Sequence, residues 1–197
     1  MKGEYKGTDG IDGIESKGRE LVEAKSASLG VGGFIFRLLG FTFSLVACIV
    51  IGLDKQTKTV PIKLIDSLPP LNVPVTAKWN YMSAVLYFLV TNAVACTYAA
   101  LSLLLALVNR GKCKRLGTLI NVLDAFMVAL LFSGNGAAAA VGVIGYQGNS
   151  HVKWKKVCNV FEKFCDQMAA SIVVSLVASL AFLILVLVHA IGIHRRT

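Results

Sequence analysis

Residues 170–193 read ASIVVSLVASLAFLILVLVHAIGI and are apolar almost throughout. The stretch contains no acid, lysine or arginine. A bilayer core of about 30 Å requires roughly 20 helical residues at about 1.5 Å each, and this stretch is long enough to cross it. A soluble helix of similar length would keep one polar face, which is missing here. The stretch therefore predicts a membrane-spanning helix over about residues 168–193.

The chain contains further long apolar segments on the N-terminal side of this helix. They cover about residues 31–53, 79–108 and 116–146. Each meets the same length requirement, so the sequence predicts an all-α membrane protein, a four-transmembrane-helix bundle over residues 31–193.

The segments outside the spans are polar. Residues 1–30 mix acids, lysines and glycines with few apolar residues, which predicts a disordered tail. Residues 194–197 form a short basic tail. All four prolines lie between spans one and two, and we expect an extended exposed loop there.

Basic residues determine the predicted orientation. The formal net charge is +9, but the lysines and arginines cluster beside apolar runs rather than forming a stripe with aromatics, which argues against nucleic-acid binding. The short loop at residues 109–115 carries four basic residues and no acid. Because basic residues in short loops dominate orientation, this loop and both termini are predicted to be cytoplasmic.

Two charged residues lie inside the apolar segments, Arg37 in span one and Asp124 in span three. An ionisable group in hydrocarbon should face the bundle and have a partner. Both spans enter from the same side, and both residues lie roughly 9–12 Å deep at 1.5 Å per residue. We therefore predict an intramembrane ion pair. The alternatives are an Arg37 side chain that snorkels to the interface and a proton or ion relay, although no other acid occurs within the spans.

Cys158 and Cys165 share the loop before span four, on the predicted outer side. The oxidising surroundings favour a disulfide between them. Residues seven apart on one continuous helix stand about 10 Å apart, so the bond requires a bend in this segment. The alternative is two free thiols.

Small residues recur at intervals of four in spans three and four. In lipid, such stripes let helix backbones approach closely. The stripes predict helix packing, either within one subunit or between subunits, by Gly134, Ala138, Gly142, Ser171, Ser175 and Ser179. A second, adjacent stripe contains Gly136 and Ala140.

The sequence contains no GxSxG, no HExxH and no phosphate-binding glycine loop. It also contains no Cys/His pattern with zinc-binding spacing and no CxxC redox motif. We therefore predict no enzyme activity, no catalytic residues, no cofactor and no metal site.

Four features of the sequence belong together: FIFRLLGFTFSL at 34–45, LINVLDAFMVALLFSGNGAAAAVGVIGYQGN at 119–149, Trp154 followed by VCNVFEKFC at 157–165, and the basic end IHRRT at 193–197. In combination they resemble the Casparian strip membrane domain protein-like (CASP-like) family of plants. Arg37 and Asp124 match the intramembrane arginine and aspartate of that family. The resemblance covers the chain from about residue 31 to its end.

The resemblance implies a multi-pass plasma-membrane protein with cytoplasmic termini and a MARVEL-like four-helix architecture. It also implies homo- and hetero-oligomers, including homodimers and heterodimers, with other CASP-like proteins. The first loop, KQTKTVPIKLIDSLPPLNVPVTAKW at 55–79, lacks the ETLPFFTQF-like stretch associated with strip-forming members. The chain therefore resembles a CASP-like member rather than a true strip-forming one.

The resulting functional prediction is a non-enzymatic scaffold that oligomerises in the lipid bilayer, organises membrane domains and recruits extracellular wall-modifying enzymes. The alternative is a small channel or transporter subunit in which Asp124 lines a polar path.

Overall fold

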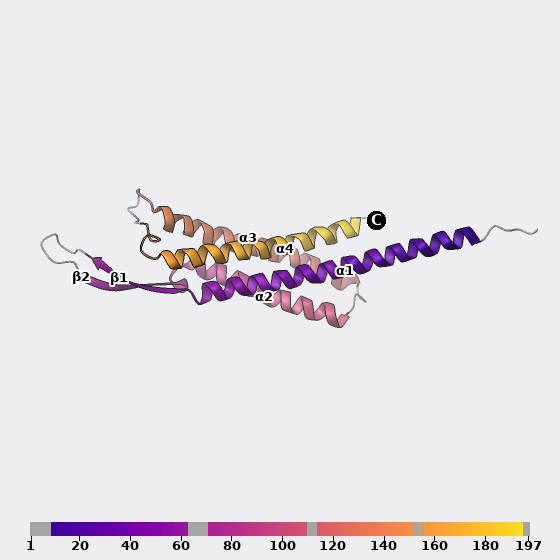
Figure 1. Cartoon of the computed structure of the whole chain (residues 1–197), viewed down its shortest axis with the longest axis horizontal. Coiled ribbons are helices and arrows are strands. Elements are labelled where there is room, and N and C mark those ends of the chain that lie inside the picture. Colours follow the sequence, from indigo (N-terminus) through magenta and orange to yellow (C-terminus); the bar gives the residue numbers. More distant parts are fainter. Residues whose placement is uncertain (1–8, 63–70, 110–113, 152–153, 155, 195–197) are drawn as a thin grey trace, which may run out of the picture. The chain divides into compact units, whose positions relative to one another are not determined.

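The computed structural model describes residues 9–62, 71–109, 114–151, 154 and 156–194. In chain order, the elements are α1 (Asp9–Gly52), β1 (Lys55–Ile62), β2 (Leu71–Lys78), the short 3-10 helix η1 (Trp79–Tyr81), α2 (Ser83–Asn109), α3 (Lys114–Gln147) and α4 (Glu162–His194), as shown in Figure 1.

The described chain contains four helices that are long and apolar enough to cross a membrane. Their candidate spans are Val31–Gly52, Ser83–Val108, Gly117–Gln147 and Glu162–Gly192. The predicted four-helix membrane architecture is therefore confirmed. The cytoplasmic placement of the termini stays a prediction.

The first helix begins earlier than expected. We predicted a disordered tail through residue 30, but α1 starts at Asp9. A helix that has already formed in span one adds residues upstream without the cost of a new nucleus, and the segment contains no proline to stop it. Among the described residues, those up to Ile35 belong to one compact unit and those from Phe36 onward to a second.

The expected proline-containing loop is replaced in part by a β-hairpin. Strands β1 and β2 pair antiparallel, with Lys55 opposite Lys78 and Ile62 opposite Leu71. Because a two-stranded sheet has only edge strands, Pro61 and Pro74 can sit where no ladder donor is needed. The β-branched residues of both strands favour the extended conformation, and the prolines do not prevent it.

The helices enclose two apolar clusters. The cluster nearer the hairpin contains Ala47, Ile51, Val85, Phe88, Ala138, Phe161, Phe164 and Met168. The second contains Ala95, Ala99, Met127, Leu131, Phe182 and Leu185. Many large apolar side chains point away from both clusters, including Leu101 and Val122, each 60% exposed. In a bilayer these outward side chains meet lipid, so their exposure carries no penalty.

Some predicted features lie outside the described residues. They are the first eight residues of the N-terminal tail, Arg110 and Lys112 of the basic loop, and the C-terminal residues 195–197.

Candidate functional site

Arg37 and Asp124 lie together in the structure. Arg37 on α1 donates two hydrogen bonds to the Asp124 carboxylate on α3, Nη1 to Oδ1 at 3.0 Å and Nη2 to Oδ2 at 2.5 Å. The Asp124 side chain is 3% exposed and that of Arg37 is 12% exposed. This paired geometry engages both carboxylate oxygens, and such bidentate pairs are the stronger class of charged hydrogen bond.

A third residue of this site, Tyr98 on α2, was missed by the sequence analysis. Its hydroxyl lies 2.6 Å from Asp124 Oδ1 and 2.9 Å from the Ile120 carbonyl oxygen, so one proton is shared between two acceptors. The Tyr98 ring also packs against Phe182 of α4, with centroids 6.2 Å apart. The polar cluster Arg37–Tyr98–Asp124 therefore joins α1, α2 and α3, and its aromatic edge reaches α4.

A depth count could have found Tyr98. Tyr98 and Asp124 each lie about ten residues, or roughly 15 Å, from the short connection between α2 and α3. A tyrosine at the same depth as a buried aspartate can donate a hydrogen bond to it. Because apolar spans often contain aromatic residues, the presence of a tyrosine was not enough to predict this bond.

The predicted stripe on α3 lies mostly against α2 and α4. Gly134 is so close to α2 that an added Cβ would stand within contact distance of three atoms of Thr91. Ala138 is buried, and a Cβ on Gly142 would lie 3.1 Å from Met168 Cε of α4. The neighbouring stripe differs, because a Cβ on Gly136 would meet nothing within 4 Å. The stripe of Gly136 and Ala140 is exposed.

The predicted serine stripe of α4 is fully buried, since Ser171, Ser175 and Ser179 are each 0% exposed. Ser175 donates to Asn92 Oδ1 of α2 at 2.8 Å, and Asn135 of α3 donates to Ser179 Oγ at 3.1 Å. Ser171 donates to the Met168 carbonyl within its own helix. The stripe therefore combines close packing with hydrogen bonds that connect α2, α3 and α4 in a water-poor interior.

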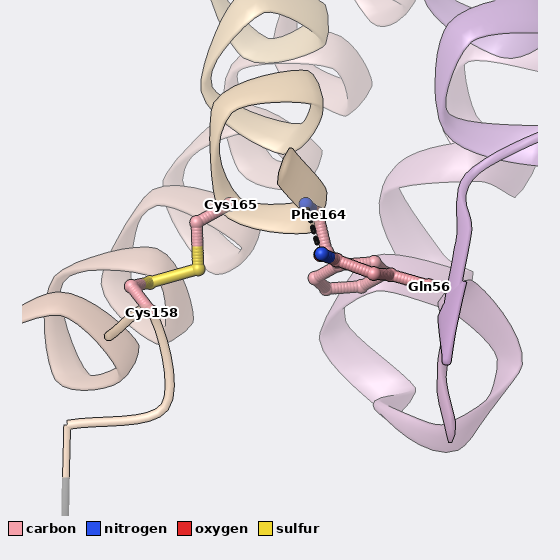
Figure 2. The surroundings of a disulfide bond; sticks show 4 residues. All are labelled: Gln56, Cys158, Phe164 and Cys165. Atoms are coloured by element: carbon pink, nitrogen blue, oxygen red, sulfur yellow. Dashed lines mark hydrogen bonds between the residues drawn. A yellow bond between two sulfur atoms is a disulfide. The ribbon is translucent and has the colours of Figure 1, made fainter. Parts of the chain in front are cut away.

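The structure joins Cys158 and Cys165 by a disulfide, with their Cα atoms 5.7 Å apart (Figure 2). The required bend is present because α4 begins only at Glu162, between the two cysteines. The Cys158 N–H donates to the Gly145 carbonyl of α3 at 3.2 Å. Phe164 precedes Cys165 of the disulfide, and its N–H donates to Gln56 Oε1 of β1 at 3.0 Å. The disulfide segment therefore contacts both the end of α3 and the hairpin.

Asp54, which the sequence did not single out, is a buried acid just after α1. It is 1% exposed, and among the described residues neither of its carboxylate oxygens has a hydrogen-bond partner. Burial raises the pKa of Asp54 to about 6, against an opposing effect of the Lys163 ammonium on α4. The C-terminal end of α1 also disfavours a negative charge.

This burial predicts a pH-dependent stability. Because the folded-state pKa is raised, the folded state holds the Asp54 proton more tightly than the unfolded state does. The contribution of the Asp54 proton to the free energy of unfolding should therefore be fully present below about pH 4. It should be lost as the pH rises through about 6, which lowers the stability by about 1–2 kcal/mol. Thermal unfolding of the detergent-purified chain across this range measures the effect.

Asp54→Asn should remove most of that pH dependence and raise the stability at neutral pH. The matched control is Asp166→Asn, which replaces an exposed acid on α4. It should keep the pH dependence of stability of the wild-type chain. An Asp54→Asn profile parallel to wild type would show that another group titrates.

Among the described residues, no group of three or more His, Cys, Asp or Glu side chains is placed to hold a metal ion. The polar side chains gathered in the bundle instead bind one another across helices.

Comparison with known proteins gives the family. Residues 26–181 match the model of the Casparian strip membrane protein domain. The chain belongs to this family. Within the family it is 72% identical to CASP-like protein 1E2 of Glycine max, over 94% of this chain and 100% of that relative. It is also 45% identical to CASP-like protein 1E1 of Arabidopsis thaliana, over 95% and 98% of the two chains. No solved structure gives a significant match.

Family membership confirms the resemblance stated from the sequence. The chain is a multi-pass CASP-like membrane protein with plant relatives, and it would sit in a lipid bilayer.

Proposed function

We propose that the chain is a non-enzymatic plasma-membrane scaffold that forms homo- and hetero-oligomers with other CASP-like proteins. It would organise membrane domains and recruit extracellular wall-modifying enzymes. The supporting observation is that α3 has two small-residue stripes with different surroundings. The stripe containing Gly134 is filled by its own subunit, whereas the stripe of Gly136 and Ala140 remains open.

An open stripe of small residues suits a subunit contact in lipid. Helices associate there by close packing, because lipid tails offer no hydrophobic drive to bring them together. Gly136 and Ala140 lie about one turn apart on α3, so both can meet the same helix of a neighbouring copy.

The intramembrane pair of Arg37 and Asp124 serves the scaffold by holding one subunit together. The channel alternative has no observation in its favour, because both Asp124 oxygens accept hydrogen bonds within the subunit, from Arg37 and Tyr98. The Asp124 charge is thus already balanced by the Arg37 guanidinium within the subunit.

The test is fluorescence recovery after photobleaching of a tagged chain in plant cells. A scaffold should show slow recovery from discrete plasma-membrane patches. Ala140→Leu should speed recovery several-fold by blocking the open stripe, while leaving surface expression unchanged.

The matched control is Ala93→Leu, the same change at an exposed position of α2. It should recover as slowly as wild type. Rapid, uniform recovery of the wild-type chain would contradict the scaffold proposal, and equal effects of the two variants would place the subunit contact elsewhere.

A further inference from the structure

A cavity of about 660 Å³ lies at the end of the bundle that carries the hairpin. It is formed by η1 and the start of α2, the end of α3, and the loop that precedes α4. Its lining is mainly apolar and includes Ala84, Val141 and Ile144. The volume falls in the range of sites that hold small organic ligands, about 300–1,000 Å³.

The cavity straddles the predicted edge of the membrane. The candidate spans of α2 and α3 end in its wall, at Ser83 and close to Gly145. Val141, at its deeper end, lies about 9 Å below the end of the α3 span at 1.5 Å per residue. Two aromatic residues at the shallow end, Tyr81 and Trp154, are 65% and 63% exposed. Exposed tyrosine and tryptophan beside an apolar wall are typical of the lipid headgroup level.

One described basic residue, Lys156, lies close to the shallow end. Lys156 lies in the chain between Trp154 and Val157, which both line the cavity. Its Cγ stands 3.4 Å from the position of a Cβ on Gly148, so its stem lies over the end of α3. The stretch HVKWKK at 151–156 carries three lysines and no acid. A ligand that fits this arrangement has an apolar body and an anionic head.

We propose that this cavity binds one anionic phospholipid, whose acyl chain occupies the apolar part and whose phosphate meets Lys156. The surrounding bilayer supplies this ligand at high local concentration, and lysines near the surface attract anionic headgroups. Tyr81 and Trp154 flank the glycerol region, where their polar edges can donate hydrogen bonds while their rings stay against the acyl chain.

Fluorescence quenching tests the proposal on the full-length chain. The chain has two tryptophans, so Trp79→Phe leaves Trp154 as the reporter at the cavity. The protein is reconstituted in phosphatidylcholine nanodiscs that contain a small fraction of phosphatidylglycerol with brominated acyl chains. Brominated phosphatidylcholine at the same fraction is the reference. We expect about fivefold tighter association of the anionic lipid, as one lysine near the surface would give.

Two pairs of variants, each a test and its control, separate binding in the cavity from general lipid contact. Ala84→Leu places a larger side chain in the cavity wall, where it obstructs an acyl chain, and should reduce the excess quenching by the anionic lipid. Ala93→Leu on the outward face of α2 should preserve that excess. Lys156→Gln should abolish the preference for the anionic headgroup, whereas Lys58→Gln on the hairpin should not.

Equal quenching by both lipids at every fraction would overturn the proposal, as would an Ala84→Leu variant that behaves like its parent. Inorganic phosphate that displaces the preference would show a site for a free anion instead of a lipid. Native mass spectrometry of the purified chain provides a further outcome. Dimers that retain no phospholipid would assign the cavity to a second copy of the chain.

Discussion

Asp124→Asn alone is expected to reduce the stability of the folded bundle by about 3–5 kcal/mol and to lower surface expression strongly. The reason is that Arg37 would keep its charge in an interior where the Asp124 side chain is only 3% exposed. An unpaired charge at this depth cannot regain its hydration. Arg37→Leu alone should do similar damage by leaving the Asp124 carboxylate with only the Tyr98 hydroxyl. Denaturant titration in detergent and surface labelling in cells measure both effects.

The double variant Arg37→Leu/Asp124→Asn should lose less than the sum of the two single losses, since neither charge is then left unpaired. Tyr98→Phe is the matched neutral control. It removes a hydrogen bond from the same carboxylate but leaves the charges paired, so we expect a loss of about 1 kcal/mol. Strictly additive losses in the double variant would show that Arg37 and Asp124 act independently.

Gly134→Ala is expected to destabilise the chain by up to about 3 kcal/mol, although alanine is intrinsically the better helix former. The new methyl group would overlap Thr91 Oγ1 and lie 3.3 Å from Thr91 Cβ. Thr91 is buried and donates to the Phe88 carbonyl at 3.0 Å, so moving its hydroxyl breaks that hydrogen bond. The alternative is a separation of α2 from α3. Thermal unfolding in detergent measures the change.

The chain offers a control two residues away. Gly136→Ala adds the same methyl group where nothing within the subunit lies within 4 Å, so the stability of the detergent-solubilised monomer should be unchanged or slightly higher. Thr91→Ala, combined with Gly134→Ala, should recover most of the lost stability because it removes the clashing hydroxyl. If Gly134→Ala and Gly136→Ala proved equally mild, close approach of α2 and α3 at Gly134 would not be a stability determinant.

The two largest expected effects follow from different physical causes. The loss at Asp124 is electrostatic and depends on pairing, whereas the loss at Gly134 is steric and depends on helix separation. Variants at the two sites should therefore combine additively, since they share no partner among the contacts described here.

The four membrane spans could be predicted from the residues alone, because crossing a bilayer depends on the length and apolarity of each segment. The residues also pointed to the partners Arg37 and Asp124, since both charges are visible and their depth follows from counting residues. The bend between Cys158 and Cys165 followed similarly, from the fixed rise of a helix set against the reach of a disulfide.

The rotation of each helix about its axis could not be predicted from the residues and follows from the packing of the folded bundle. A helix that is apolar on every side does not mark which side faces its neighbours, because lipid and protein interior are equally apolar. Residue counting gives the depth of Tyr98, but the helix rotations alone bring its hydroxyl to Asp124 and make it the third member of the polar cluster. The structure also showed which of the two α3 stripes is filled, since the stripes of Gly134 and Gly136 look equivalent in the sequence.

The same limit applies outside the spans. The β-hairpin depends on pairing between residues such as Thr57 and Thr76, whose hydroxyls lie 3.0 Å apart across the two strands. Such pairing joins residues that are far apart in the chain, and the prolines between them indicated a loop instead. Burial of Asp54 likewise required the hairpin and the start of α4 to be brought together, which no stretch of residues near Asp54 could indicate.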